Sequence, residues 1–125
     1  MKTSIWFLAI IFVSVFCIGC GGSMSNSCII TANVTPASAI ANHNLAPPAN
    51  QVQFSTIGNA TGNCPLLRDM VGAWSTSDPG HTSISNQAGS VGLATCLGAT
   101  ATPATISNSG TIRGKGFTSA TLACQ

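Results

Sequence analysis

The amino-acid sequence predicts an all-β domain, and three observations point to this class. No stretch keeps the 3.6-residue apolar period of an amphipathic helix. Short segments rich in β-branched residues recur instead, and clusters of glycine, proline and asparagine separate them. Charged residues make up only 5% of the chain, but apolar residues make up 45%, which does not indicate a disordered chain.

Seven strands are expected along the chain. In the second strand, Val52 and Phe54 alternate with polar residues, and in the last strand Leu122 and Cys124 share one face, as in strands with one buried side. The seven expected strands are residues 28–34, 51–57, 71–77, 82–86, 91–96, 103–108 and 117–124.

The segments between these strands have the composition of turns. The proline-rich residues 46–50 block a strand before Gln51. Residues 58–63 are expected to open a long loop, and residues 78–80 (Asp-Pro-Gly) are typical of a tight turn. Residues 113–116 alternate basic residues with glycine and are expected to close the last hairpin.

Short strands at this spacing, with a tryptophan on the third, are typical of an immunoglobulin-like β-sandwich. Trp74 and Phe54 are therefore expected to anchor the core, because Phe54, Trp74 and Phe117 are the aromatic residues that follow position 19. A surface tryptophan that stacks on a glycan is the alternative for Trp74.

Residues 74–79 are a tryptophan followed by serine, threonine, serine, aspartate and proline. This run, the most specific of several stretches of the expected domain, resembles the bacterial Ig-like domain of group 2. Two features depart from the family pattern: a long loop that contains Cys64, and Pro103 where the family tends to have glycine. The resemblance covers about residues 29–124 and implies a β-sandwich of the adhesion class. An unrelated small β-sandwich is the alternative. The stretches are residues 34–39, 51–54, 73–79, 83–85, 92–94 and 104–106.

The first nineteen residues have the pattern of a signal peptide. Lys2 precedes an almost unbroken apolar run, residues 5–18, whose length of about 21 Å as a helix is short of the ~30 Å hydrocarbon core. The run ends in Cys-Ile-Gly-Cys at residues 17–20, which resembles the lipobox of bacterial lipoproteins. This resemblance implies that Cys20 is acylated and becomes the mature N-terminus. A plain secretory peptide cut near Gly22 is the alternative.

The expected organisation has three parts. Residues 1–19 are a cleaved lipoprotein signal peptide, residues 20–27 a flexible tether, and residues 28–125 the Ig-like β-sandwich domain. Acyl chains on Cys20 would hold the protein at a membrane without spanning it. Gly21 follows the acylated position, and by the sorting rule of enterobacterial lipoproteins it favours the outer membrane. The expected location is therefore the bacterial cell envelope, with the domain facing the periplasm or the cell surface.

Four cysteines remain after Cys17 and Cys20, an even number that indicates disulfides in an exported chain. Strand direction selects between the pairings, because alternate strands of an antiparallel series run the same way. By this argument Cys28 and Cys64 lie at one end, and Cys96 and Cys124 at the other. We therefore expect Cys28–Cys64 and Cys96–Cys124. A zinc site with all four cysteines is the alternative, although no CxxC pair occurs.

The charge composition argues against several functions. Four Lys and Arg make no basic patch for phosphate neutralisation, so no nucleic-acid partner is expected. Two acidic residues and two histidines leave few candidates for acid–base catalysis. Asp78 and His81, with Ser77 and Ser83 nearby, could be drawn as a nucleophile–base–acid group, but residues 77–81 have the sequence of a turn. His43 and His81 are far apart in sequence, so no metal site and no cofactor are expected.

The sequence thus favours a non-enzymatic, lipid-anchored envelope module for adhesion, surface interaction or scaffolding, with an unknown protein or glycan partner. Loops 58–70 and 97–102 are the expected contact surfaces. Arg113 and Lys115 are expected to be solvated hairpin charges, and contact with anionic glycans or lipid headgroups is the alternative.

Two rival functions stay open. The first is an accessory subunit of a larger envelope assembly or secretion complex, in which Leu66, Leu67 and Met70 contact a partner. The second is a periplasmic enzyme, which would need a cleft that holds His43 and His81 together.

Overall fold

The computed structural model describes residues 27–125, and every regular element in this range is a β-strand. The expected signal peptide, Cys20 and all of the expected tether except Ser27 lie outside the described residues. The strands are β1 (Cys28–Thr35), β2 (Ser38–Ala41), β3 (Gln51–Gln53), β4 (Ser55–Gly62), β5 (Trp74–Thr76), β6 (Thr82–Ile84), β7 (Leu93–Cys96), β8 (Ala104–Asn108), β9 (Thr111–Ile112), β10 (Lys115–Gly116) and β11 (Ala120–Cys124).

Two sheets form the body of the domain. One has the strand order β2-β11-β8-β5, and the other has the order β3-β7-β6. Strand β2 runs parallel to β11, whereas the other neighbours in these sheets are antiparallel. One core cluster takes residues from both sheets, so the all-β architecture is consistent with a β-sandwich.

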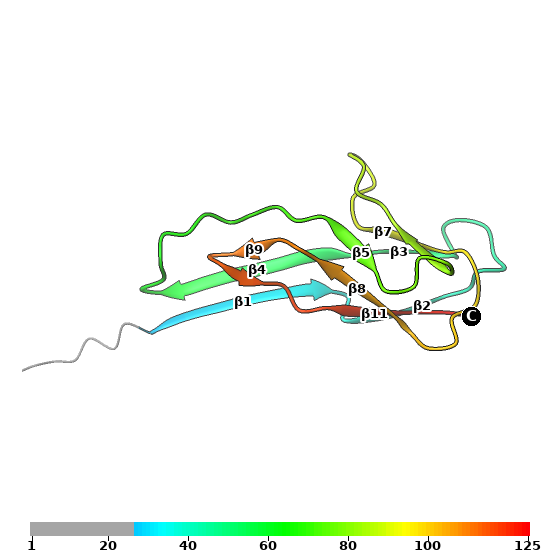
Figure 1. Ribbon diagram of the computed structural model, residues 1–125, viewed down its shortest axis with the longest axis horizontal. Coiled ribbons are helices and arrows are strands. Elements are labelled where there is room, and N and C mark those ends of the chain that lie inside the picture. Colours follow the sequence, from blue (N-terminus) through cyan, green and yellow to red (C-terminus); the bar gives the residue numbers. More distant parts are fainter. Residues whose placement is uncertain (1–26) are drawn as a thin grey trace, which may run out of the picture.

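A long two-stranded ladder extends the domain beyond this body. Strands β1 and β4 pair antiparallel over eight residues, from Cys28 opposite Gly62 to Thr35 opposite Ser55. Strand β4 continues the direction of β3, and the chain changes partner at Phe54, whose N–H donates to the Gly92 carbonyl at 2.8 Å. Figure 1 shows the result, an elongated molecule with the β1–β4 ladder at one end and the C-terminus at the other.

The core between the sheets is small and rich in alanine. Phe54 and Trp74 are its large aromatic residues, with exposed fractions of 1% and 6%. Both lie where the sequence places core anchors. The buried cluster also includes Val34, Ala41, Ala94, Cys96, Ile106, Ala120, Leu122 and Cys124.

Strands lie at all seven expected positions, but their bounds differ. The prediction of a loop from residue 58 is wrong in its first part, because residues 58–62 belong to β4 and pair with β1. Their glycine and asparagine disfavour a strand locally, but eight residues of β1 supply backbone partners. Strand β2 was not predicted, because its four residues carry no distinct alternation and are held by pairing with β11.

The last hairpin lies where the sequence predicts it, between β9 and β10. Its two central residues, Arg113 and Gly114, have φ values of 48° and 81°. Positive φ at both central positions is the geometry of a type I′ turn, which matches the right-handed twist of the flanking strands. Arginine is unusual in this conformation, and its backbone N–H donates to the Asp69 carboxylate at 3.0 Å.

Candidate interaction surface

Residues 63–73 connect β4 to β5. Residues 63–70 are the remaining part of the expected contact loop, and residues 71–73, where the sequence predicts the start of the third strand, lie outside β5. The backbone of residues 63–73 is tied to the β9–β10 hairpin. The Met70 N–H donates to the Thr111 carbonyl at 2.8 Å, and the Thr111 N–H donates back to Met70 at 3.0 Å. The Arg113 guanidinium donates to the Leu67 carbonyl at 3.3 Å. The segment is therefore held in place although it contains no strand.

The apolar side chains of this segment point outward. Leu66 and Val71 are 93% and 101% exposed, and Leu67 and Met70 are 52% and 64% exposed. Four large apolar side chains within six consecutive residues are more than the scattered exposure of an ordinary surface. The sequence prediction named Leu66, Leu67 and Met70; the structure adds Val71.

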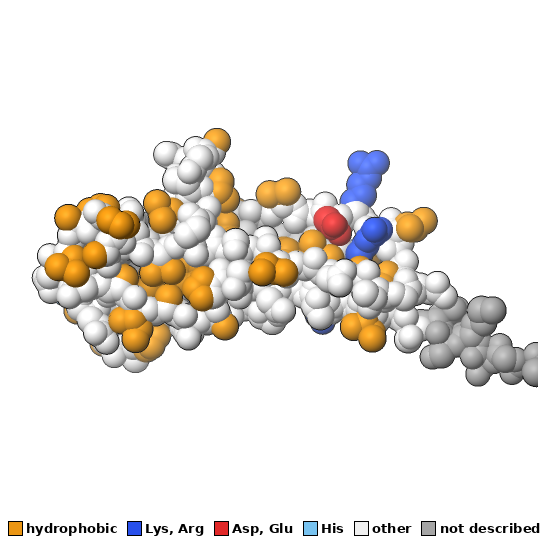
Figure 2. Space-filling model, turned by 180° about the vertical axis from the view of Figure 1, so that it is seen from behind, with side chains coloured by type: hydrophobic (Ala, Val, Ile, Leu, Met, Phe, Trp, Pro, Cys, Tyr) orange, Lys and Arg blue, Asp and Glu red, His pale blue; other side chains and the backbone are white. Residues whose placement is uncertain are grey.

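Basic side chains lie beside these apolar residues. Arg68 is part of the segment, Arg113 is bonded to it, and Lys115 donates through Nζ to the Ile30 carbonyl of β1 at 2.6 Å. Figure 2 shows the Lys and Arg side chains gathered toward the end of the domain that carries residue 27. We call the following six residues together the basic–apolar surface: Leu66, Leu67, Arg68, Met70, Val71 and Arg113. Lys115 lies at the same end of the domain but contacts β1.

Two shallow cavities lie beside Trp74, and the first of them is lined in part by residues of this surface. The first has a volume of about 200 Å³ and is lined mainly by apolar side chains, including Met70, Val71, Trp74 and Phe117. The second, of about 220 Å³, shares Trp74 with the first and adds Phe54. Each is below the roughly 300 Å³ at which small-molecule sites begin, so neither is an evident site for a large ligand.

The Cys28–Cys64 disulfide lies at the same end of the domain. Cys28 is the first residue of β1, and Cys64 lies two residues after the end of β4. Their Cα–Cα distance is 4.6 Å. The disulfide therefore fixes the start of the 63–73 segment to the point where the described chain begins. The basic–apolar surface lies at the N-terminal end of the molecule (Figure 1).

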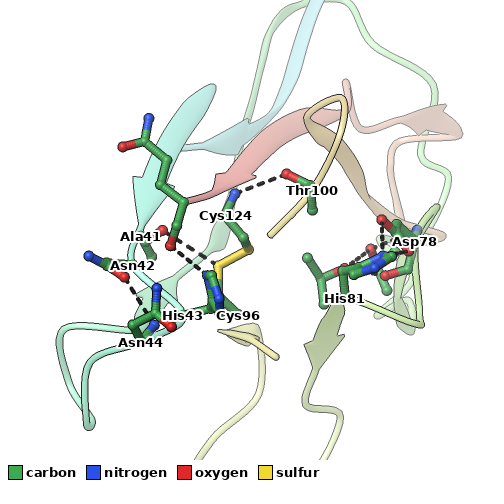
Figure 3. Close-up of a disulfide and its surroundings, with 12 residues drawn as sticks. Ala41, Asn42, His43, Asn44, Asp78, His81, Cys96, Thr100 and Cys124 are labelled. Atoms are coloured by element: carbon green, nitrogen blue, oxygen red, sulfur yellow. Dashed lines mark hydrogen bonds and ion pairs between the residues drawn. A yellow bond between two sulfur atoms is a disulfide. The ribbon is translucent and has the colours of Figure 1, made fainter. Parts of the chain in front are cut away.

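The second disulfide, Cys96–Cys124, lies at the opposite end and joins β7 to β11, one strand from each sheet. Its Cα–Cα distance is 5.6 Å, and both cysteines are buried. Thr100, in the expected contact loop 97–102, holds this end through its hydroxyl, which accepts from the Cys124 N–H at 3.0 Å (Figure 3). Both disulfides have the pairing expected from strand direction.

The histidines and Asp78 have separate local contacts. The His43 ring donates from Nδ1 to the carbonyl of Gln125 at 2.7 Å. The His81 Nδ1 lies 2.9 Å from Asp78 Oδ2, and both residues are in the turn before β6 (Figure 3). The Ser77 hydroxyl accepts from the Thr105 N–H at 2.8 Å. Within residues 27–125, no group of three His, Cys, Asp or Glu side chains could hold a metal ion.

Sequence reasoning missed that Arg113 belongs to the same surface as Leu66 and Leu67. The two groups are more than 40 residues apart, and their hairpin and segment meet only through tertiary contacts. Comparison with known proteins finds no family model and no curated protein that matches this chain. Among the described residues there is no helix of the length and apolarity needed to cross a membrane.

Proposed function

We propose that this protein is a non-enzymatic, lipid-anchored immunoglobulin-like module of the bacterial cell envelope, which serves adhesion, surface interaction or scaffolding. One observation carries the proposal: the domain is elongated, with the chain entering at one end and the loops around Cys96–Cys124 at the other (Figure 1). A chain acylated at Cys20 would present those far loops, 42–50 and 97–102, away from the membrane.

The strand order supports the immunoglobulin-like assignment. Three pairs of consecutive strands can each be counted as one strand: β3 with β4, β8 with β9, and β10 with β11. Besides β2, the domain then has seven main strands, which in chain order are β1, β3–β4, β5, β6, β7, β8–β9 and β10–β11. The first, second, fifth and fourth strands then lie on one side, and the third, sixth and seventh on the other. This is the distribution of constant-type immunoglobulin domains. The disulfide that bridges the sheets joins the fifth and seventh strands, whereas antibody domains join the second and sixth.

A second function has one observation in its favour. The exposed apolar side chains of Leu66, Leu67 and Met70 are available to a protein partner, as in an accessory subunit of an envelope assembly or secretion complex. Such a subunit would lose its partner when these side chains are replaced by serine, whereas an adhesion module that acts through its far loops would not.

The first test is the intact mass of the membrane-extracted protein, measured before and after reduction and thiol labelling. The proposal expects the mass of residues 20–125 plus acyl chains, and four thiols that react only after reduction. A mass that retains residues 1–19, or thiols that react before reduction, would overturn it. Chemical cross-linking on intact cells then separates the two functions, because it identifies which end of the domain contacts a partner.

A further inference from the structure

We propose that the basic–apolar surface is a lipid-contact surface, which binds the anionic headgroup layer of the membrane that anchors the chain. This inference rests on the proposed function, because it uses the position of the acylated Cys20. It adds a second, non-covalent contact between the folded domain and the membrane. The basic–apolar surface would then contact the lipid directly, so the domain would have a fixed orientation instead of being held by its N-terminus alone.

The length of chain before the domain supports this occupant. Eight residue steps separate Cys20 from Cys28, and a fully extended chain covers at most about 29 Å over that number. Cys28 is bonded to Cys64, which lies two residues before Leu66. An anchor at Cys20 therefore keeps the segment within reach of the headgroup layer, and keeps the Cys96–Cys124 end far from it (Figure 1).

The charge distribution also fits an anionic surface. Within residues 27–125, the Lys and Arg residues are Arg68, Arg113 and Lys115. Arg68 and Arg113 belong to the basic–apolar surface, and Lys115 lies at the same end of the domain, bonded to Ile30 of β1. Asp69 is the acidic residue at this end, so the local net charge is three minus one, or +2. Basic side chains near anionic lipids strengthen binding by about fivefold each, and their long stems keep the charge at headgroup level.

The exposed apolar residues supply the other half of such a contact. Leu66 and Val71 are almost fully exposed, and Leu67 and Met70 are at least half exposed. Interfacial protein segments insert apolar side chains between headgroups while their cations contact phosphates. The Met70–Thr111 pair and the Asp69–Arg113 bond hold the segment before any contact, so little ordering is required on binding.

The test measures how fast Met70 is oxidised in the acylated protein reconstituted into vesicles. Phosphatidylcholine vesicles with and without added phosphatidylglycerol are compared, and hydrogen peroxide is used because an uncharged oxidant is not repelled by anionic lipid. The oxidation rate of Met24 in the same chain corrects for differences in the peroxide concentration near the vesicle surface. We expect Met70 to be oxidised at least fivefold more slowly on the anionic vesicles, and salt to restore the rate, since salt screens exposed charges.

Matched variants locate the effect. Arg68→Gln and Leu66→Ser should each restore most of the oxidation rate of Met70. Leu97→Ser should not, although Leu97 is also an exposed leucine, because it lies beside Cys96 at the opposite end. An equal effect of Leu97→Ser, or equal Met70 oxidation on both vesicle types, would overturn the inference. Protection that appears only after an envelope protein extract is added would also overturn it, because the occupant would then be a protein.

Failure of this inference can be told apart from failure of the proposed function. The intact mass of the same sample counts the acyl chains, so a mass without them contradicts the anchor alone. The oxidation comparison is still made in that case, with the vesicles added to the protein. Met70 protection without acylation supports the lipid-contact surface, and absence of protection in a fully acylated sample refutes it.

Discussion

The side chain of Asn86 pairs with both backbone polar groups of Trp74. Its Oδ1 accepts from the Trp74 N–H at 2.6 Å, and its Nδ2 donates to the Trp74 carbonyl at 3.0 Å. Trp74 belongs to β5 at the edge of one sheet, and Asn86 follows β6 at the edge of the other. One amide side chain thus replaces a missing strand at the edge of β5 and links the two sheets beside the core tryptophan.

Replacement of Asn86 by alanine should destabilise the domain by about 1–2 kcal/mol, because it leaves the two Trp74 backbone groups without this partner. Asn86→Asp should be no better near neutral pH, since a carboxylate cannot donate to the Trp74 carbonyl. Urea unfolding followed by the fluorescence of Trp74 measures both. The adjacent exposed Gln87→Ala is the control and should change stability by less than about 0.5 kcal/mol. Equal effects at positions 86 and 87 would contradict the role of Asn86.

Gly92 precedes β7 and should not tolerate a side chain. Its φ is +78°, and a Cβ there would overlap the carbonyl oxygen of Phe54. Gly92→Ala should therefore destabilise the domain by at least about 2 kcal/mol, measured by thermal unfolding. Gly89→Ala is the matched control, because Gly89 has a φ of +88° but no atom within 4 Å of its added Cβ. Gly89→Ala should reduce the free energy of unfolding by only about 1 kcal/mol, the cost of a side chain at positive φ.

The two disulfides should differ in their contribution to stability. Loops of 36 and 28 residues predict similar chain-entropy losses, about 3–4 kcal/mol each. Replacement of both Cys96 and Cys124 by alanine should cost more than the same change at Cys28 and Cys64, because only the first pair is buried in the core cluster. Urea midpoints of the two double variants, compared with the parent chain, measure this. A larger loss at Cys28 and Cys64 would contradict the assignment of Cys96–Cys124 as the core pair.

Removal of the Asp69 carboxylate should loosen the basic–apolar surface without unfolding the domain. Asp69 accepts the Arg113 N–H in the hairpin turn, and Met70 next to it pairs with Thr111. Asp69→Ala should therefore speed amide hydrogen exchange at Met70 and Thr111 and leave Ile106 and Leu122 protected. Asp78→Ala is the control, because Asp78 bonds His81 at the other end of the domain. Unchanged exchange at Met70 and Thr111 in Asp69→Ala would contradict this role of the Asp69 carboxylate.

Much of the fold could be predicted from local sequence. The Asp-Pro-Gly turn before β6, the proline-rich block before β3 and the Arg-Gly turn between β9 and β10 all lie at the predicted places. Each depends on the φ preferences of a few neighbouring residues, which act without tertiary contacts. The positions of Phe54 and Trp74 in the core follow from the scarcity of aromatic residues after position 19.

The sequence by itself determined the all-β class, the turn positions and the two cysteine pairs. The class and the turns follow from the backbone preferences of neighbouring residues. The cysteine pairs follow from the alternating direction of successive strands. Only the tertiary structure decided that residues 58–62 extend a strand, that β2 joins β11 in parallel, and that Arg113 contacts Leu67. Backbone hydrogen bonds between distant segments decided these features. Such bonds are open to almost any residue type, so they leave little pattern in the sequence.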